Sequence, residues 1–152
     1  MMLKGGGDLD YESVFDMNYL SNCFSETMRS YPVATTSSLM EILSDTSLGG
    51  KLQVQKNDIV AVDIYGLHNN PKEWREPEKF IPDRFDPESD YYLTAAGRKR
   101  HSASYMPFLS GQRSCFGKTY AEVAVRTVTS ILIYHFDWTV EDDDFKCYTP
   151  GY

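Results

Sequence analysis

The chain has 152 residues and a mass of 17.4 kDa, enough for one domain with a modest hydrophobic core. Its net charge of −7 argues against nucleic acid as the main partner, because binding phosphates requires a basic surface. Three cysteines without a Cys-x-x-Cys pair argue against a structural zinc site and favour thiols over disulfides. The longest apolar run, residues 128–136, is interrupted and too short to span a bilayer, so we expect any membrane anchor to lie outside this chain.

The first predicted elements follow a Gly-rich lead-in, residues 1–10, which we expect to be flexible. Apolar residues recur at helical spacing after Asp16, a candidate N-cap, and Pro32 ends the pattern, so a helix is predicted over residues 16–30. Short strands are predicted on either side of a Gly-Gly turn, around residues 39–43, 51–55 and 59–64.

A Pro-rich coil with short turns is predicted over residues 69–113. A coil of this length is uncommon inside a compact domain, so we expect it to be functional and held in place by other parts of the molecule. A second helix is predicted from Gly117 to about His135. One face of that helix would carry Tyr120, Val123, Ala124, Thr127, Ile131 and Tyr134. The tail from residue 141 receives no assignment.

The strongest chemical signal is the segment Phe108-Leu-Ser-Gly-Gln-Arg-Ser-Cys-Phe-Gly117, directly before the second helix. Gly111 and Gly117 permit a tight loop whose backbone can approach a flat ligand. Cys115 lies where the helix begins, and the unpaired amides and dipole there favour the thiolate, the ligating form of cysteine. Arg113 could reach an anionic group. A lone cysteine at a helix start is more often a small buried apolar residue, and only the spacing of the whole segment favours a ligand.

Two charged motifs accompany this segment. Glu26-Thr-Met-Arg29 ends the first predicted helix, and alone it would be a solvated pair worth roughly a few tenths of a kcal/mol. Phe80-Ile-Pro-Asp-Arg84-Phe85 lies in the coil, and alone it would be an ordinary turn with an exposed arginine.

Together, the three motifs have the order and about the spacing found in cytochromes P-450, and Phe-x-x-Gly-x-Arg-x-Cys-x-Gly resembles that family's haem-binding loop. Smaller matches, such as Leu67-His-Asn-Asn-Pro71 and Tyr105-Met-Pro-Phe108, extend the resemblance to microsomal-type members over residues 9–140. The resemblance implies a mainly α fold with a small β-sheet (α+β), the incomplete proximal, carboxy-terminal part of the P-450 fold, over residues 11–152.

The resemblance also assigns roles to individual residues. Cys115 would be the axial ligand of haem iron, Arg113 a propionate partner and Phe108 a shield over the sulfur, while Gly111 and Gly117 would shape the loop. No catalytic residue is expected in this chain beyond the haem ligand. A buried ionic triad would lock the coil beneath the haem, formed by Glu26, Arg29 and Arg84.

The implied activity is haem-thiolate monooxygenation, the insertion of one atom of O₂ into an organic substrate. Electrons would come from NADPH through a flavoprotein reductase or another acidic donor, and a full-length protein would lie on the cytosolic face of the endoplasmic reticulum membrane. The chain alone is expected to be inactive, and its own location is either soluble or unknown. The basic residues Arg98–Arg100, with Lys118, are either a docking face for the donor or part of a solvated loop.

Four features depart from the family pattern. The chain is much shorter than a complete member and lacks the distal helix with its acid–Thr pair. Leu109 stands where the family commonly has Gly, so its bulk could crowd the loop. No Arg or His follows Pro32 to meet a haem propionate, and the chain ends before the family's last strands. An incomplete gene model is the favoured explanation of the length. The alternative is a non-catalytic relic or interaction subunit, against which the intact Cys115 argues.

The remaining histidines and cysteines are expected to play no part in metal binding. Each of His68, His101 and His135 is interpreted as structural or exposed. Cys23 is interpreted as core packing, and Cys147 lies in the unassigned tail.

Overall fold

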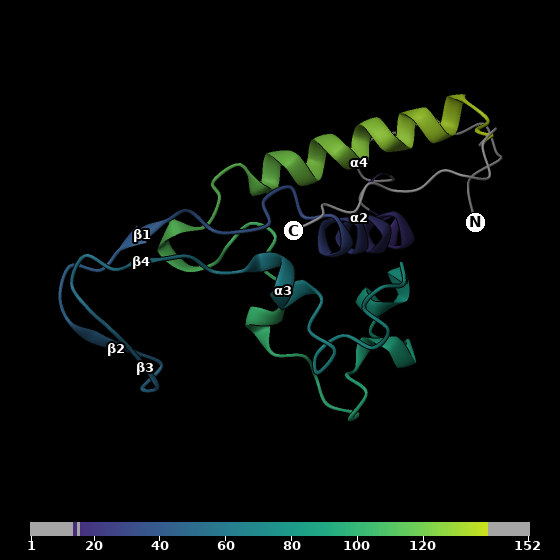
Figure 1. Cartoon of the computed structure of the whole chain (residues 1–152). Helices are drawn as coiled ribbons and strands as arrows, with labels where there is room; N and C mark the ends of the chain where they lie inside the picture. The colour runs from purple at the N-terminus through teal and green to yellow at the C-terminus, as the bar shows by residue number, and fades with distance from the viewer. Residues whose placement is uncertain (1–13, 15, 140–152) are drawn as a thin grey trace.

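The computed structural model describes residue 14 and residues 16–139 (Figure 1). Two longer helices dominate it, α2 (Asn18–Ser30) and α4 (Lys118–His135), and α4 packs against α2. A β-hairpin extends to one side, and the Pro-rich coil folds beneath α2. Mainly helical architecture with little β-structure confirms the predicted fold class. The predicted lead-in, the tail from residue 141 and Cys147 lie outside the described residues.

Helix α2 begins two residues later than predicted. Met17 occupies the N-cap position and makes no side-chain capping bond. The prediction of an Asp16 cap is therefore wrong: Asp16 contributes only its main-chain carbonyl, which accepts the Asn18 amide at 2.9 Å. The helix ends at Ser30, because Tyr31 leaves the helical region ahead of Pro32.

The β-structure forms two small antiparallel sheets in place of one. In the first, β1 (Met40–Glu41) pairs with β4 (Ile59–Val60). In the second, β2 (Thr46–Leu48), a strand that was not predicted, pairs with β3 (Leu52–Val54). Gly49 and Gly50 join β2 to β3, and both have the positive φ that a tight hairpin turn requires.

Residues 61–64 do not extend strand β4 as predicted. The chain instead turns into a short helix, α3 (Ile64–His68), whose N-cap is the side chain of Asp63. The Asp63 carboxylate accepts the Gly66 amide at 2.8 Å. Helix α3 delivers His68 to the base of α2, where both elements are in contact.

The predicted coil over residues 69–113 contains only single turns of 3₁₀ helix. The first of them, η1 (Pro82–Phe85), lies against α2 and holds the coil in place. This agrees with the expectation that so long a coil is held by other parts of the molecule. The later turns are η2 (Asp90–Tyr92), η3 (Ser102–Ser104) and η4 (Gly111–Arg113).

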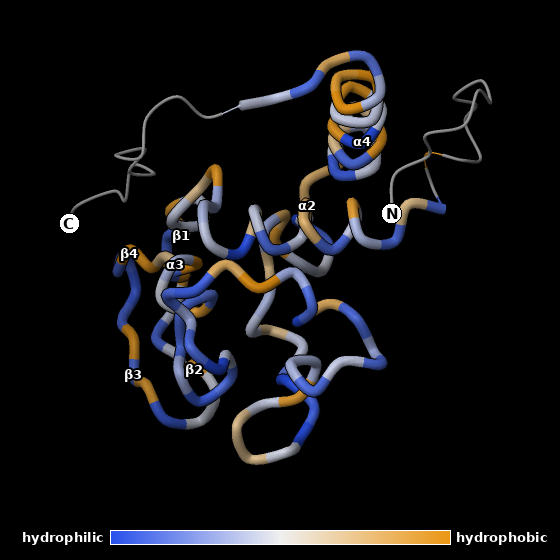
Figure 2. Tube along the Cα trace, turned by 90° about the vertical axis from the view of Figure 1, so that its right-hand side faces the viewer, coloured by the Kyte–Doolittle hydropathy of each residue, from blue (hydrophilic) through white to orange (hydrophobic). Residues whose placement is uncertain are grey.

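The buried interior holds more polar than apolar side chains. Trp74 is the largest buried residue, and it lies beside the rings of Phe85 and Tyr105, with centroids 5.9 Å and 6.1 Å away. The predicted apolar face of α4 is not part of this interior, because Tyr120 is 80% exposed and Ile131 43% exposed. Figure 2 shows that hydrophobic and hydrophilic residues are interspersed along α4. Within the described residues, no helix combines the length and hydropathy needed to cross a bilayer.

Candidate functional site

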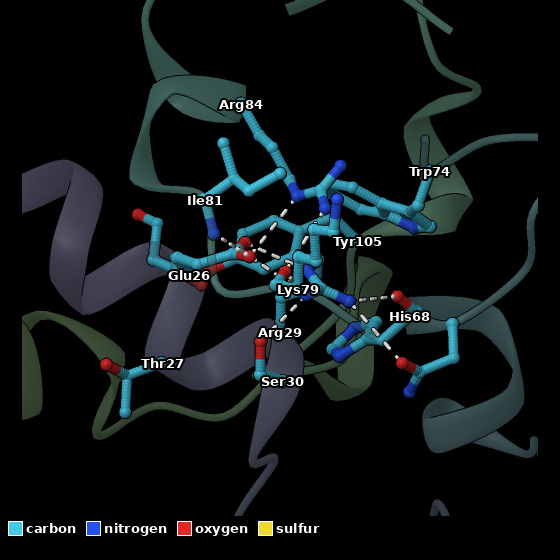
Figure 3. Close-up of polar contacts among 12 residues, drawn as sticks. Glu26, Thr27, Arg29, Ser30, His68, Trp74, Lys79, Ile81, Arg84 and Tyr105 are labelled. Atoms are coloured by element: carbon cyan, nitrogen blue, oxygen red, sulfur yellow. Dashed lines mark hydrogen bonds and ion pairs between the residues drawn. The ribbon is translucent and has the colours of Figure 1, made fainter. Parts of the chain in front are cut away.

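The Glu26 carboxylate is the centre of a buried ionic cluster, formed by Glu26, Arg29 and Arg84, all 0% exposed (Figure 3). Arg29 approaches along the same helix face, with Nε 2.8 Å from Oε2 and Nη2 2.9 Å from Oε1. Arg84 arrives from η1, and its Nε lies 3.2 Å from Oε1. The main-chain amide of Ile81 donates a further hydrogen bond to Oε1 at 2.8 Å. The solvated-pair interpretation of Glu26 and Arg29 is therefore wrong.

Both arginines also donate hydrogen bonds to main-chain carbonyls of the coil. Arg84 donates from Nη2 to Glu76 at 2.6 Å and to Lys79 at 3.2 Å, and from Nη1 to Arg75. Arg29 donates from Nη2 to the same Lys79 carbonyl at 3.2 Å. Burial lowers the pKa of Arg84, and the adjacent Glu26 charge opposes that shift. The cluster thereby fixes the path of the coil and also pairs its own buried charges.

A third arginine, which the motifs did not reveal, extends this arrangement. Arg100 is half-buried, stacks 4.5 Å from the Trp74 ring, and donates to the carbonyls of Tyr91 and Arg84. Its neighbour Arg98 pairs with Glu73. Of the basic segment Arg98–Arg100, only Lys99 thus remains exposed without an ion pair among the described residues, and the segment is largely structural.

The loop from Phe108 to Gly117, hereafter the Cys loop, presents Cys115 to solvent as a free thiol. The Cys115 amide donates to the carbonyl of Phe108 at 2.8 Å, which closes the loop. Gly111 has a φ of +75°, a conformation that favours glycine, and it starts the turn η4. Arg113, at the end of η4, is exposed. Phe108 is half-buried and contributes its carbonyl to this closure.

Gly117 is the N-cap of α4, so Cys115 lies directly before the helix, as predicted. A Cβ added to Gly117 would lie 3.7 Å from the Cys115 sulfur, an ordinary contact beside the thiol. Leu109 has a φ of +60°, and this explains why glycine suits its position: the constraint is the backbone conformation and not side-chain bulk.

The surroundings of Cys115 fit a thiolate-bound haem. One exposed soft sulfur donor is followed in the sequence by two exposed rings, Phe116 and Tyr120, which are 104% and 80% exposed, and is preceded by the exposed cation Arg113. A cavity of about 120 Å³, lined by Phe108 and Leu109 but not by Cys115, is too small for a porphyrin. Among the described residues, no group of three His, Cys, Asp or Glu side chains could hold a metal ion.

The histidines and Cys23, which were not expected to bind metal, differ in their burial. His101 and His135 are exposed. His68 is 0% exposed, and both its main-chain carbonyl and its ring accept hydrogen bonds from other parts of the molecule. Cys23 is half-buried on α2, and this partial burial raises its pKa. It is not one of the buried core residues, so the core-packing interpretation is wrong.

Comparison with known proteins places these features in context. The family profile for cytochrome P450 matches residues 2–150. The chain is 33% identical to the probable cytochrome P450 4p2 of Drosophila melanogaster, over 85% of this chain and 23% of that protein. It is 33% identical to cytochrome P450 4A12 of Rattus norvegicus, over 90% of this chain and 25% of that protein.

Solved structures agree with the sequence relatives. The crystal structure of the cytochrome P450DA heme domain matches with a TM-score of 0.70 and 27% identity, covering 85% of this chain and 27% of that one. A mutant of the same heme domain matches with a TM-score of 0.77 and 25% identity, covering 95% and 31%. The chain spans about a quarter of the length of the curated relatives it matches. It belongs to the cytochrome P450 family of haem-thiolate monooxygenases.

Proposed function

We propose that this chain supplies the proximal, haem-binding part of a monooxygenase, with Cys115 as the axial ligand of the haem iron. The observation that carries the proposal is the exposed free thiol of Cys115 on a closed loop directly before α4. The thiolate is the form of cysteine that binds a metal ion. Bound there, the haem would supply the oxygen chemistry, promoted by electron donation from the thiolate.

The remaining motif residues hold the ligand and shape its surroundings. Arg113 is the expected partner of a haem propionate, and its exposed guanidinium is free to turn toward an anion. Gly111 and Gly117 set the turn before the sulfur and the helix start after it. Glu26, Arg29 and Arg84 act at a distance from the thiol, as the rigid base on which the coil and the Cys loop rest.

Electron supply and location follow from the family assignment and remain part of the proposal. We expect an organic small-molecule substrate, NADPH as the electron source and a flavoprotein reductase as the partner. The exposed cations near the Cys loop, Arg113 and Lys118, offer a contact for an acidic donor, whereas Arg98 and Arg100 are engaged within the fold. A protein of this kind would lie at the endoplasmic reticulum membrane.

A chimera provides the test. The matching quarter of rat cytochrome P450 4A12 is replaced by this chain, and the ferrous carbon monoxide spectrum is recorded after haem incorporation. We expect the red-shifted Soret band of thiolate ligation, lost in Cys115→Ser because a neutral hydroxyl is a far weaker donor to iron. Cys23→Ser is the matched control and should keep the band. A band that survives Cys115→Ser, or is lost in Cys23→Ser, would overturn the proposal.

A further inference from the structure

His68 lies between the ionic cluster and the Cys loop and bonds to both sides. It is the last residue of α3 and is 0% exposed. Its main-chain carbonyl accepts a hydrogen bond from Arg29 Nη1 at 3.0 Å, as Figure 3 shows. Its ring Nε2 accepts the main-chain amide of Met106 at 2.9 Å. One residue therefore joins the cluster to the segment that leads into the loop.

From Met106 the hydrogen bonds continue to Cys115. The Met106 carbonyl accepts the Leu109 amide at 3.1 Å, and the Phe108 carbonyl accepts the Cys115 amide at 2.8 Å. The segment between His68 and the Cys115 amide is therefore a short, continuous path of main-chain contacts. A displacement of Met106 would be passed directly to the turn that closes on Cys115.

The surroundings of the ring fix its chemical form. Because Nε2 accepts a hydrogen bond, the ring proton must lie on Nδ1, which is buried. No hydrogen bond of good geometry from Nδ1 is found among the described residues, although main-chain groups of Arg29 and Met28 interact with the ring and raise its pKa. Burial lowers the pKa of His68 to about 4, so the ring is neutral near pH 7 and Nε2 is free to accept. The hydrogen bond of good geometry that the ring makes is therefore the one that Nε2 accepts from Met106.

The face of the ring is also held. The His68 and Tyr105 rings lie 5.4 Å apart, and the Tyr105 hydroxyl donates to the Ser25 carbonyl of α2 at 3.1 Å. Trp74 adds a hydrogen bond from Nε1 to the Ser104 carbonyl at 3.3 Å. Residues 104–106 are thus clamped from three directions, and His68 is the member whose contact lies nearest the Cys loop.

We propose that His68 is a positioning residue for Cys115, a neutral imidazole that holds the Met106 amide and so fixes the Cys loop to the ionic cluster. It acts through Met106 and touches neither the thiol nor a reacting atom. The role of Cys115 as a haem ligand rests on the proposed function, whereas the hydrogen bonds of His68 do not.

The test compares His68→Gln with His68→Asn by amide hydrogen exchange, followed by NMR. The glutamine carbonyl oxygen can occupy the position of Nε2, whereas that of asparagine reaches only the position of Nδ1. In His68→Asn we expect the Met106, Leu109 and Cys115 amides to exchange about tenfold faster, while the β2–β3 hairpin is unchanged. In His68→Gln the same amides should stay within about threefold of the unaltered chain. His101→Gln, at an exposed histidine of the same coil, is the matched control.

A second measurement uses the unaltered chain and therefore decides the matter even if a variant fails to fold. Nitrogen-15 shifts of the His68 ring should show a proton on Nδ1 and none on Nε2. A proton on Nε2, or equal amide exchange in the glutamine and asparagine variants, would overturn the proposal. Loss of loop protection in His68→Asn without a thiolate band in the chimera would leave His68 as a positioning residue and refute only the haem ligand.

Discussion

The two sides of the molecule reverse the usual relation between polarity and burial. Beneath α2, the charged cluster of Glu26, Arg29 and Arg84 is fully buried. Around the Cys loop and α4, large apolar side chains such as Phe116 and Tyr120 are exposed. The buried charges are satisfied by partners within this chain, so that side is complete in itself. The exposed apolar side has the character of a binding surface, and Cys115 lies on it.

This contrast predicts that stability resides in the charged side and that ligand binding resides in the other. The largest expected effect follows from Glu26→Ala, which strands two buried guanidinium groups. We expect it to lower the free energy of unfolding by about 3–5 kcal/mol, measured by urea denaturation. Glu41→Ala, at an exposed glutamate of β1, should change it by less than about 0.5 kcal/mol. A loss of only about 1 kcal/mol in Glu26→Ala would mean that the cluster is solvated.

A smaller effect separates the two interpretations of the basic segment. Arg100→Met keeps a long apolar stem but removes the stacking on Trp74 and the two bonds to main-chain carbonyls. We expect a loss of about 2 kcal/mol in the free energy of unfolding. Lys99→Met removes a charge from an exposed neighbour and should be nearly neutral. Equal effects of the two substitutions would show that Arg100 belongs to a solvated loop.

The pH dependence of stability isolates His68 on the buried side. The pKa of its ring is 6.5 in the unfolded chain and about 4 in the folded one, chiefly through burial. Between these values the unfolded state binds more protons, so stability is full above pH 6.5 and is lost as the pH falls toward 4. From pH 7.5 to pH 5.5 the free energy of unfolding should decrease by roughly 1 kcal/mol from this group. His68→Gln should remove that decrease, and an unchanged pH profile in the variant would contradict the assignment.

The smallest expected effect lies in the Cys loop and distinguishes strain from bulk. Leu109 has a positive φ, which costs a leucine about 1–2 kcal/mol. Leu109→Gly relieves this strain but loses packing, so we expect a net change below about 1 kcal/mol. Leu109→Ile keeps the bulk and adds a β-branch at positive φ, and it should be clearly less stable. A lower thermal midpoint for glycine than for isoleucine would show that side-chain packing decides the position.

The motifs indicated which residues belong to a common site, whereas contacts that arise only when the chain folds could not be predicted. The resemblance to cytochromes P-450, and not the spacing of each motif alone, implied that Glu26, Arg29 and Arg84 meet, and the structure brings them together. The burial of Arg100 could not be predicted, because the sequence shows a run of charges and not the Trp74 ring against which one of them stacks. The division between a lead-in over residues 1–10 and a domain over residues 11–152 stays a prediction.

Two elements, helix α3 and strand β2, had only weak signals in the sequence, and other patterns nearby favoured a different prediction. Asp63 is a good helix cap, yet the apolar run before it favoured a strand through residue 64. Strand β2 carries no alternating pattern and all of it is exposed, so only the Gly49-Gly50 turn indicated a hairpin there. In the Cys loop, the sequence shows that Leu109 is unusual for its position, but it does not reveal the positive φ of its backbone.

The most direct test of the account is whether the iron of a bound haem carries a sulfur ligand from Cys115. Iron-edge X-ray absorption on the haem-loaded chimera would detect a sulfur atom in the first coordination shell. We predict that this sulfur is present in the unaltered chain and in Cys23→Ser, and absent in Cys115→Ser. A sulfur scatterer that persists in Cys115→Ser, or a shell of nitrogen and oxygen alone in the unaltered chain, would contradict the account.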